Sequence, residues 1–226
     1  DLVRSRGLGD VYKRQGMLVG RITIDDVVDV IRDEAEQRMM RMAGLDEEED
    51  IYAPVRGAAR RRALWLGINL ATAFMASWVV GLFEATISQA VALAVLMPIV
   101  ASMGGIGGSQ TLTLMVRGLA LGQIGGGSAK ALLRKELSVA AINGLLWALV
   151  VAAITLFWFG NPLLSLVIAL AMLFNQLCAA LAGVTIPLLL KKLSIDPALA
   201  GSVILTTITD VVGFFVFLGL GALILL

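Results

Sequence analysis

The stretch "TTITDVVGFF", residues 206–215, places one carboxylate, Asp210, inside a run that is otherwise uncharged and mostly apolar from residue 201 to residue 226. A run of this length crosses a bilayer as a helix, because about 20 apolar residues span about 30 Å of hydrocarbon. An ionised Asp at the centre of such a helix costs about 2.5–3.5 kcal/mol on insertion scales. Other parts of the chain must therefore account for Asp210.

The composition is typical of a protein that crosses the membrane several times. Of the 226 residues, 58% are hydrophobic and 15% are charged, and most charged residues lie before Leu64. The chain has no histidine, and its single cysteine, Cys178, leaves no intrachain disulfide. This composition argues against a zinc hydrolase or a Ser-His-Asp enzyme, and we expect no enzymatic activity.

Five apolar runs are long enough to span a bilayer. They predict an all-α membrane protein with five transmembrane helices in a domain over residues 63–226. The runs occupy residues 64–83, 90–116, 137–159, 163–190 and 201–226.

Basic residues flank these runs on one side of the membrane only. They precede the first run (Arg60 to Arg62), separate the second from the third (Arg117 to Lys135), and separate the fourth from the fifth (Lys191 and Lys192). By the positive-inside rule, the N-terminus is expected in the cytoplasm and the C-terminus outside, in a multi-pass protein of the inner or plasma membrane.

The residues before the first run are soluble in character. Residues 1–15 are polar, lack periodicity and begin without Met, so we expect a remnant of a translated sequencing adapter, with natural N-terminal sequence missing. Residues 16–24, "GMLVGRITI", predict a turn and a short strand. Residues 25–45 predict an amphipathic helix capped by Asp25 or Asp26, and a linker with an acidic block, a proline and a basic block follows.

Asp210 lies on a narrow polar face of its predicted helix. Ser202, Thr206, Asp210 and Gly213 follow one another at helical spacing. One interpretation is a buried structural carboxylate that accepts a hydrogen bond from Thr206 or from a neighbouring helix. The other is an acid that faces a watery pathway, which is the default for an intramembrane carboxylate. Because no Lys or Arg lies at membrane depth, a mobile cation is the natural partner.

The second run is a candidate to line the other side of that pathway. Its distinctive stretch is "MPIVASMGGIGGSQTLTLMVRG", residues 97–118. Pro98 predicts a kink. The four glycines that follow either allow close helix packing or unwind the helix to present carbonyls, as at ion sites in transporters. The candidate pore-lining residues are Ser102, Gly105, Ser109 and Thr113 here, and Thr206 and Gly213 in the last run.

One acid per chain at membrane depth suits a hydrated divalent cation. Mg²⁺ keeps several waters and needs only one or two carboxylates, and a two-fold symmetric dimer would bring two copies of Asp210 near one axis. An aspartyl protease would need a second deep acid, and a nucleotide-driven pump a phosphate loop that "GQIGGGSAKA" does not match. A proton-coupled carrier and a scaffold without transport stay open, and the residues alone leave the ion open.

Several stretches also resemble the MgtE family of magnesium channels and transporters. They are "GRITIDDVVDVI", "ALAVLMPIVASMGG", "VRGLALGQI", "FNQLCAALAGVTIPLLLKKLSIDPALA" and "TTITDVVGFF", and the resemblance runs over residues 16–226. It implies a homodimer in membrane lipid, without nucleic-acid partners, that moves Mg²⁺ into the cytoplasm through a pore lined by the second and fifth helices. Asp210 falls at the family's pore aspartate. Ile106 replaces the Asn of a Gly-Gly-Asn pattern, which leaves ion selectivity open.

The resemblance extends to the region before the membrane. It implies that residues 16–31 are the end of a CBS domain and that residues 32–62 form a cytoplasmic connecting (plug) helix and linker. Asp26, Asp29 and Glu34 match acids that bind regulatory Mg²⁺ and close the pore when cytosolic Mg²⁺ is high. The alternative function is a proton- or ion-coupled carrier for another divalent cation, Co²⁺ or Mn²⁺.

Overall fold

The computed structural model describes residues 9–12, 18–45, 52, 54–124 and 128–226. The chain divides into two compact units, Asp1–Arg62 and Ala63–Leu226. Within the described residues, five helices are long and apolar enough to cross a membrane, which confirms the predicted number.

The first unit contains a two-stranded antiparallel sheet and one helix. Strand β1 (Gly9–Tyr12) pairs with β2 (Leu18–Ile22), with Gly9 opposite Ile22 and an irregularity in the register between Val11 and Tyr12. β2 is the short strand predicted from residues 16–24. β1 lies inside residues 1–15, where the lack of periodicity predicts no strand. Strand pairing uses backbone groups, so a segment without side-chain periodicity can still join a ladder.

Helix α1 (Ile24–Met42) starts with a cap different from the one predicted. Its N-cap is Thr23, whose extended backbone (φ −94°, ψ 166°) precedes the first turn, and neither Asp25 nor Asp26 is the cap. The Asp26 amide donates to Thr23 Oγ1 (3.4 Å), while the Asp26 carboxylate accepts from the Thr23 amide (2.7 Å). This reciprocal pairing is a capping box with an acid at its third helical position.

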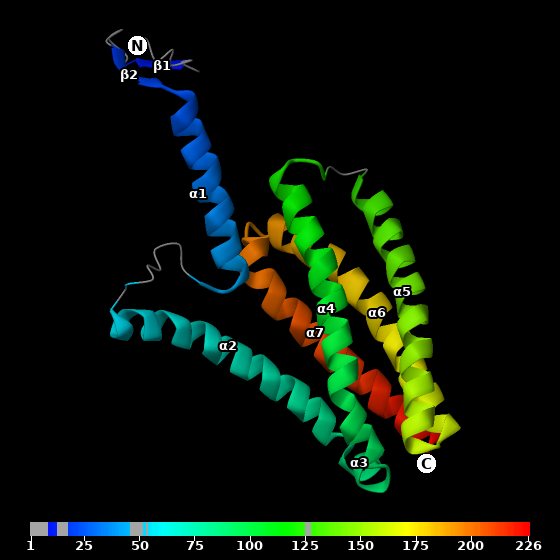
Figure 1. Cartoon of the computed structure of the whole chain (residues 1–226). Helices are drawn as coiled ribbons and strands as arrows, with labels where there is room; N and C mark the ends of the chain where they lie inside the picture. The colour runs from blue at the N-terminus through cyan, green and yellow to red at the C-terminus, as the bar shows by residue number, and fades with distance from the viewer. Residues whose placement is uncertain (1–8, 13–17, 46–51, 53, 125–127) are drawn as a thin grey trace. The chain divides into compact units, whose positions relative to one another are not determined.

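The second unit consists of the membrane helices. They are α2 (Val55–Gly81, which begins in the first unit), α4 (Ala92–Ala120), α5 (Ser128–Phe159), α6 (Pro162–Lys192) and α7 (Pro197–Ile224), with a short helix α3 (Glu84–Gln89) that was not predicted. From α4 to α7 the helices run alternately in opposite directions, so the α4–α5 and α6–α7 connections lie at the same end (Figure 1). The basic residues between these helices therefore gather at one end.

Side-chain caps and prolines set the starts of α6 and α7. Asn161 Oδ1 accepts from the Leu163 and Leu164 amides at 3.0 and 3.1 Å, and Asp196 Oδ1 accepts from the Ala198 amide at 2.9 Å. A proline follows each cap, where its fixed φ suits the first helical turn. The polar residues that flank the apolar runs are thus part of the helices. Each membrane helix reaches both ends of its predicted apolar run, or comes within two residues of them.

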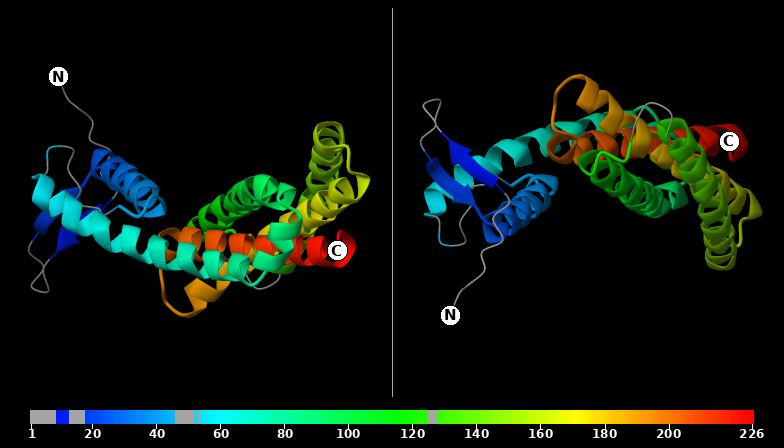
Figure 2. Two further views of the ribbon diagram at one scale, coloured as in Figure 1. Left: turned by 90° about the horizontal axis from the view of Figure 1, so that it is seen from below. Right: turned by 90° about the horizontal axis from the view of Figure 1, so that it is seen from above.

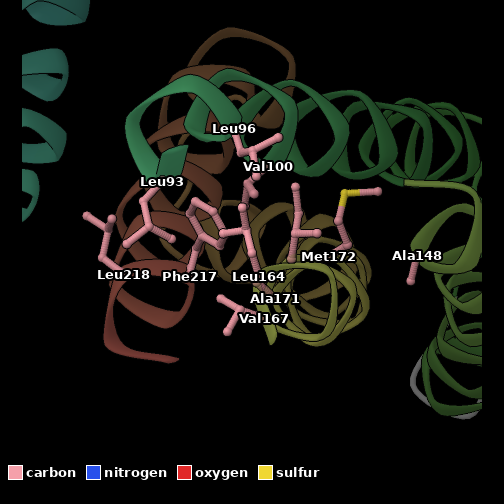
Figure 3. Close-up of a cluster of buried hydrophobic side chains, with 11 residues drawn as sticks. Leu93, Leu96, Val100, Ala148, Leu164, Val167, Ala171, Met172, Phe217 and Leu218 are labelled. Carbon is pink, nitrogen blue, oxygen red and sulfur yellow. The ribbon is translucent and has the colours of Figure 1, made fainter. Parts of the chain in front are cut away.

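Helix α6 is the centre of the bundle, with α4, α5 and α7 packed against it (Figures 1 and 2). α4 also packs directly on α7. The largest cluster of buried apolar side chains lies where these helices meet (Figure 3). It includes Leu93, Leu96 and Val100 of α4, Ala148 of α5, Leu164, Val167, Ala171 and Met172 of α6, and Phe217 and Leu218 of α7. This core holds α4 beside α7.

The glycine cluster of α4 promotes close packing and does not unwind the helix. α4 is helical without a break through Pro98 and all four glycines. A Cβ added to Gly104 would collide with Asn175, and one added to Gly108 would lie 3.0 Å from Leu205. Of the two interpretations offered by the sequence, the structure has the close approach of neighbouring helices.

Candidate functional site

Asp210 lies in the middle of α7. At about 1.5 Å per residue, it is about 20 Å from either end of the helix, which is midplane depth if α7 spans the membrane. Its side chain is partly buried, and the described part of the chain contains no hydrogen-bond or ion-pair partner for its carboxylate. Thr206 does not supply one, because its hydroxyl donates to the backbone oxygens of Ser202 (3.0 Å) and Val203 (3.1 Å).

Three of the predicted lining residues of α4 lie together on its exposed side. Gly105, Ser109 and Thr113 line an open hollow, hereafter the α4 hollow, with Ile106, Gln110 and Leu114 as its other residues. The Thr113 hydroxyl donates to the Ser109 backbone oxygen (2.8 Å). Ser102, the fourth candidate, is exposed but is not among the lining residues.

Ile106 presents an apolar side chain in the α4 hollow, with 55% of its surface exposed. It offers no oxygen to a cation. The side-chain oxygens available in the hollow belong to Ser109, Gln110 and Thr113, which are neutral. Such groups can hydrogen-bond to the waters that a reluctantly dehydrated ion such as Mg²⁺ keeps.

The candidates on α7 have different surroundings. Thr206 is partly buried, one turn before Asp210. Gly213 is buried and lies against Asn175 of α6, where an added Cβ would be 2.7 Å from Nδ2. A lining role for Gly213 therefore stays a prediction, while its contact with α6 is an observed feature of the fold.

Two consecutive amides of α6, absent from the sequence-based site, reach α4. Asn175 is 1% exposed, and its Nδ2 donates to the Val100 backbone oxygen at 2.9 Å. Gln176 is also buried, and its Nε2 donates to the Met103 backbone oxygen at 3.1 Å. The available signal was "NQ", the only two amides inside the apolar run at residues 163–190.

Glu136 is a second acid in the bundle. It lies one residue before the apolar run predicted at residues 137–159, so the sequence does not assign it to a membrane helix. In α5 it is 5% exposed, and it accepts a hydrogen bond from the Thr111 hydroxyl at 3.1 Å. Lys135 Nζ lies 3.6 Å from its other carboxylate oxygen. Glu136 borders a cavity of about 190 Å³ that Gln110, Asn143 and Gln176 also line. The protein itself supplies this carboxylate with partners, in contrast to Asp210.

The three predicted sensor acids are all exposed on α1. At about 100° per residue, Asp29 lies about 60° from Asp26 on one side and Glu34 about 80° from it on the other. They do not form one compact set, and the described residues contain no group of three acids, histidines or cysteines placed to bind a metal. Hydrogen bonds from the Thr23 amide and hydroxyl lower the pKa of Asp26. A cation held here would need ligands from elsewhere.

Comparison with known proteins assigns the chain to a family. Residues 97–220, from α4 to α7, match the family model of MgtE, described as a divalent cation transporter. The chain belongs to the MgtE family. The matched region contains the α4 hollow, Asn175 and Asp210.

Curated MgtE relatives align along nearly the whole of this chain. The magnesium transporter MgtE of Bacillus subtilis is 30% identical over 93% of the chain and 47% of its own length. The proteins of the same name from Thermus thermophilus and Enterococcus faecalis are 30% and 32% identical over 95% and 91% of the chain, and 48% and 45% of their own length. The chain thus spans about half the length of these relatives, as a multi-pass membrane protein of the MgtE family.

Proposed function

We propose that this chain transports Mg²⁺ across the membrane into the cytoplasm, with Asp210 as the carboxylate that meets the ion. The observation that carries the proposal is a carboxylate in the middle of α7 that has no partner within the described chain. The other acid in the bundle, Glu136, is satisfied by Thr111 and Lys135. The names of the relatives as magnesium transporters support the choice of ion.

The ion is expected to pass with most of its water. One carboxylate with neutral hydroxyls and amides suits Mg²⁺, which dehydrates reluctantly and keeps several waters. Ser109 and Thr113 of α4 and Thr206 of α7 are the candidate groups for holding these waters. Ile106 provides no polar group, so the proposal requires no direct ligand at that position.

The proposed assembly is a homodimer. The α4 hollow is open, and among the described residues of the membrane helices one chain supplies a single acid without a partner, so a second copy related by a two-fold axis would enclose the pathway and double its charge. The basic residues at one end of the helices support the further proposal that the N-terminus is cytoplasmic and the C-terminus outside.

Flux measurements in liposomes test the function and separate a channel from a coupled carrier. The purified chain is reconstituted with an internal Mg²⁺ indicator, and Mg²⁺ is added outside with and without a proton gradient. A channel carries Mg²⁺ down its own gradient in both conditions. Uptake only with the proton gradient, or uptake of Co²⁺ or Mn²⁺ without Mg²⁺, favours the alternative carrier. No divalent flux from correctly folded protein in any condition contradicts transport.

We also propose that cytosolic Mg²⁺ closes the pathway through the exposed acids of α1. Mg²⁺ would screen the repulsion among Asp26, Asp29 and Glu34 and hold them near groups outside α1. Patch-clamp recordings of the full chain with D26N, D29N and E34Q together should give currents that persist at millimolar internal Mg²⁺, where the parent closes. Glu36→Gln, an exposed acid of the same helix, is the matched control. Closure of the triple variant over the parent's Mg²⁺ range would exclude these acids as the sensor.

A further inference from the structure

Asn175 of α6 lies between the two helices that carry the candidate pathway. Its carboxamide faces Gly104 of α4 and Gly213 of α7, and a Cβ added to either glycine would collide with it. Its Nδ2 donates to the Val100 backbone oxygen of α4 at 2.9 Å. Two glycines from different helices thus make room for one side chain.

Filling space does not by itself explain an amide at this position. Asn175 is 1% exposed, and its Oδ1 is buried without a hydrogen-bond partner among the described residues. An unpaired buried polar atom is unfavourable, whereas an apolar side chain would occupy the site without one. The amide therefore provides something that an apolar residue does not, and the contact it makes is a directional bond to the α4 backbone.

The position of Asn175 couples it to the site. Gly213 is three residues after Asp210, less than one turn away on α7, and Gly104 directly precedes Gly105 of the α4 hollow. A change in the spacing at Asn175 therefore shifts Asp210 relative to the hollow. The next residue, Gln176, repeats the arrangement one turn along α4, with Nε2 bonded to the Met103 oxygen and Oε1 against Gly107.

We propose that Asn175 is a positioning residue of the transport pathway, which sets the spacing and register of α4 against α7 and so the place of Asp210. The inference rests on the proposed function for its consequence on ions, but the coupling between the helices is a property of the fold. The two parts are tested separately.

The first test measures ion selectivity. Asn175→Leu keeps the branching and the number of side-chain heavy atoms, although it is bulkier, and it removes the bond to Val100, so folding and insertion are checked first by thermal unfolding in detergent. In liposomes the ratio of Mg²⁺ to Ca²⁺ entry, taken from initial rates, should fall about tenfold, because a small misplacement of an ion-binding group weakens its discrimination steeply. Asn143→Leu, an exposed amide of α5, should match the parent. A folded Asn175→Leu protein with the parent's rates and selectivity would overturn the proposal.

The second test measures the coupling itself and needs no transport. Gly213→Ala, Asn175→Ala and the double variant are compared by thermal unfolding in detergent. Gly213→Ala should lower the Tm in the parent and do so much less when residue 175 is Ala, since the colliding Nδ2 is gone. Gly219→Ala, on the same helix with its nearest atom at 3.9 Å, is the control. Additive effects would overturn the proposal. If the parent moves no Mg²⁺, the proposed function fails, while this cycle still decides whether Asn175 is coupled to Gly213 of α7.

Discussion

Helix α4 has two faces built from the same kinds of residue but with different surroundings. On the packed face, Gly104, Gly108 and Thr111 are buried against side chains of α5, α6 and α7. On the open face, Gly105 has nothing within 4 Å of an added Cβ, and Ser109 lines the α4 hollow. Small and hydroxyl residues therefore do not identify a pathway by type. What faces them decides whether they pack helices or meet solvent and ions.

Helix α7 shows the same division. Leu205, Thr209 and Gly213 are buried toward the bundle, and Thr209 is 0% exposed. Thr206 and Asp210, which directly follow the buried Leu205 and Thr209, are only partly buried. Changes on the open faces of α4 and α7 should therefore impair ion movement, and changes on the packed faces should impair folding.

The largest effect is expected from Asp210→Asn on the open face. The amide keeps the shape and removes the charge, so Mg²⁺ flux should fall about 100-fold, since losing a charged partner costs about 1.5–3 kcal/mol. The chain should fold as before, because no described group depends on this carboxylate. Liposome flux and thermal unfolding are the measurements.

Glu136→Gln is the matched comparison for Asp210→Asn. It removes a carboxylate that Thr111 and Lys135 satisfy, so it should lower stability and leave the flux per folded molecule close to that of the parent. Normal Mg²⁺ uptake by the Asp210→Asn variant would contradict the distinction between open and packed faces. So would a loss of stability in Asp210→Asn together with a loss of flux in Glu136→Gln.

Gly183→Ala tests the packed face. Its added Cβ would lie 2.9 Å from the Thr111 side chain and 3.0 Å from the Gly108 backbone oxygen, which cannot move aside easily. We expect a loss of about 1–3 kcal/mol in the free energy of unfolding, as for overpacked cores. Gly67→Ala on α2, with open space around it, is the control. Equal stability of the two variants in denaturant titrations would show that this contact is not tight.

Cysteine accessibility compares the faces directly. In a background with Cys178→Ser, a water-soluble thiol reagent should modify Ser109→Cys and Thr206→Cys at least about tenfold faster than Thr209→Cys, because thiol reactivity requires exposure. Mild oxidation should also cross-link one or both open-face cysteines between chains if two copies enclose the pathway. Uniform labelling rates would argue against distinct faces. Labelling without any cross-link would favour a pathway within one chain.

The smallest effect concerns Asp26, a carboxylate whose partners come from its own chain. Bonds from the Thr23 amide and hydroxyl lower its pKa below the ordinary value of 3.8. Its contribution to the start of α1 is therefore fully present above that value and is lost as the pH falls through the lower folded pKa. The amide resonance of Thr23, followed by NMR from pH 5 to pH 2, should shift with this titration, and Asp26→Asn should abolish it. A midpoint at or above 3.8 would contradict the capping arrangement.

The sequence was sufficient to predict the five membrane helices and to single out Asp210 as an acid inside an apolar run. Apolar length and the positions of charged residues are local properties, so they located the five spans and the basic ends. Exact starts were missed where polar residues continue a helix, as at Ser128, and this error concealed Glu136. Thr23 was missed as a cap because two acids follow it closely, although a Thr three residues before an acid is itself a capping signal.

The sequence by itself determined that this is a membrane protein with five apolar spans and one acid inside the last of them. Only the tertiary structure decided which helix is central and which polar groups are satisfied. In their most apolar parts, α6 is 56% buried and α5 and α7 only 22% and 28%, although all three are similarly apolar in sequence. Hydropathy measures the free energy of transfer from water, so it does not distinguish a side chain that contacts lipid from one that contacts protein. That choice depends on which faces meet. It placed Asn175 between two glycines and left Asp210 without a partner in the part of the chain that the structure describes.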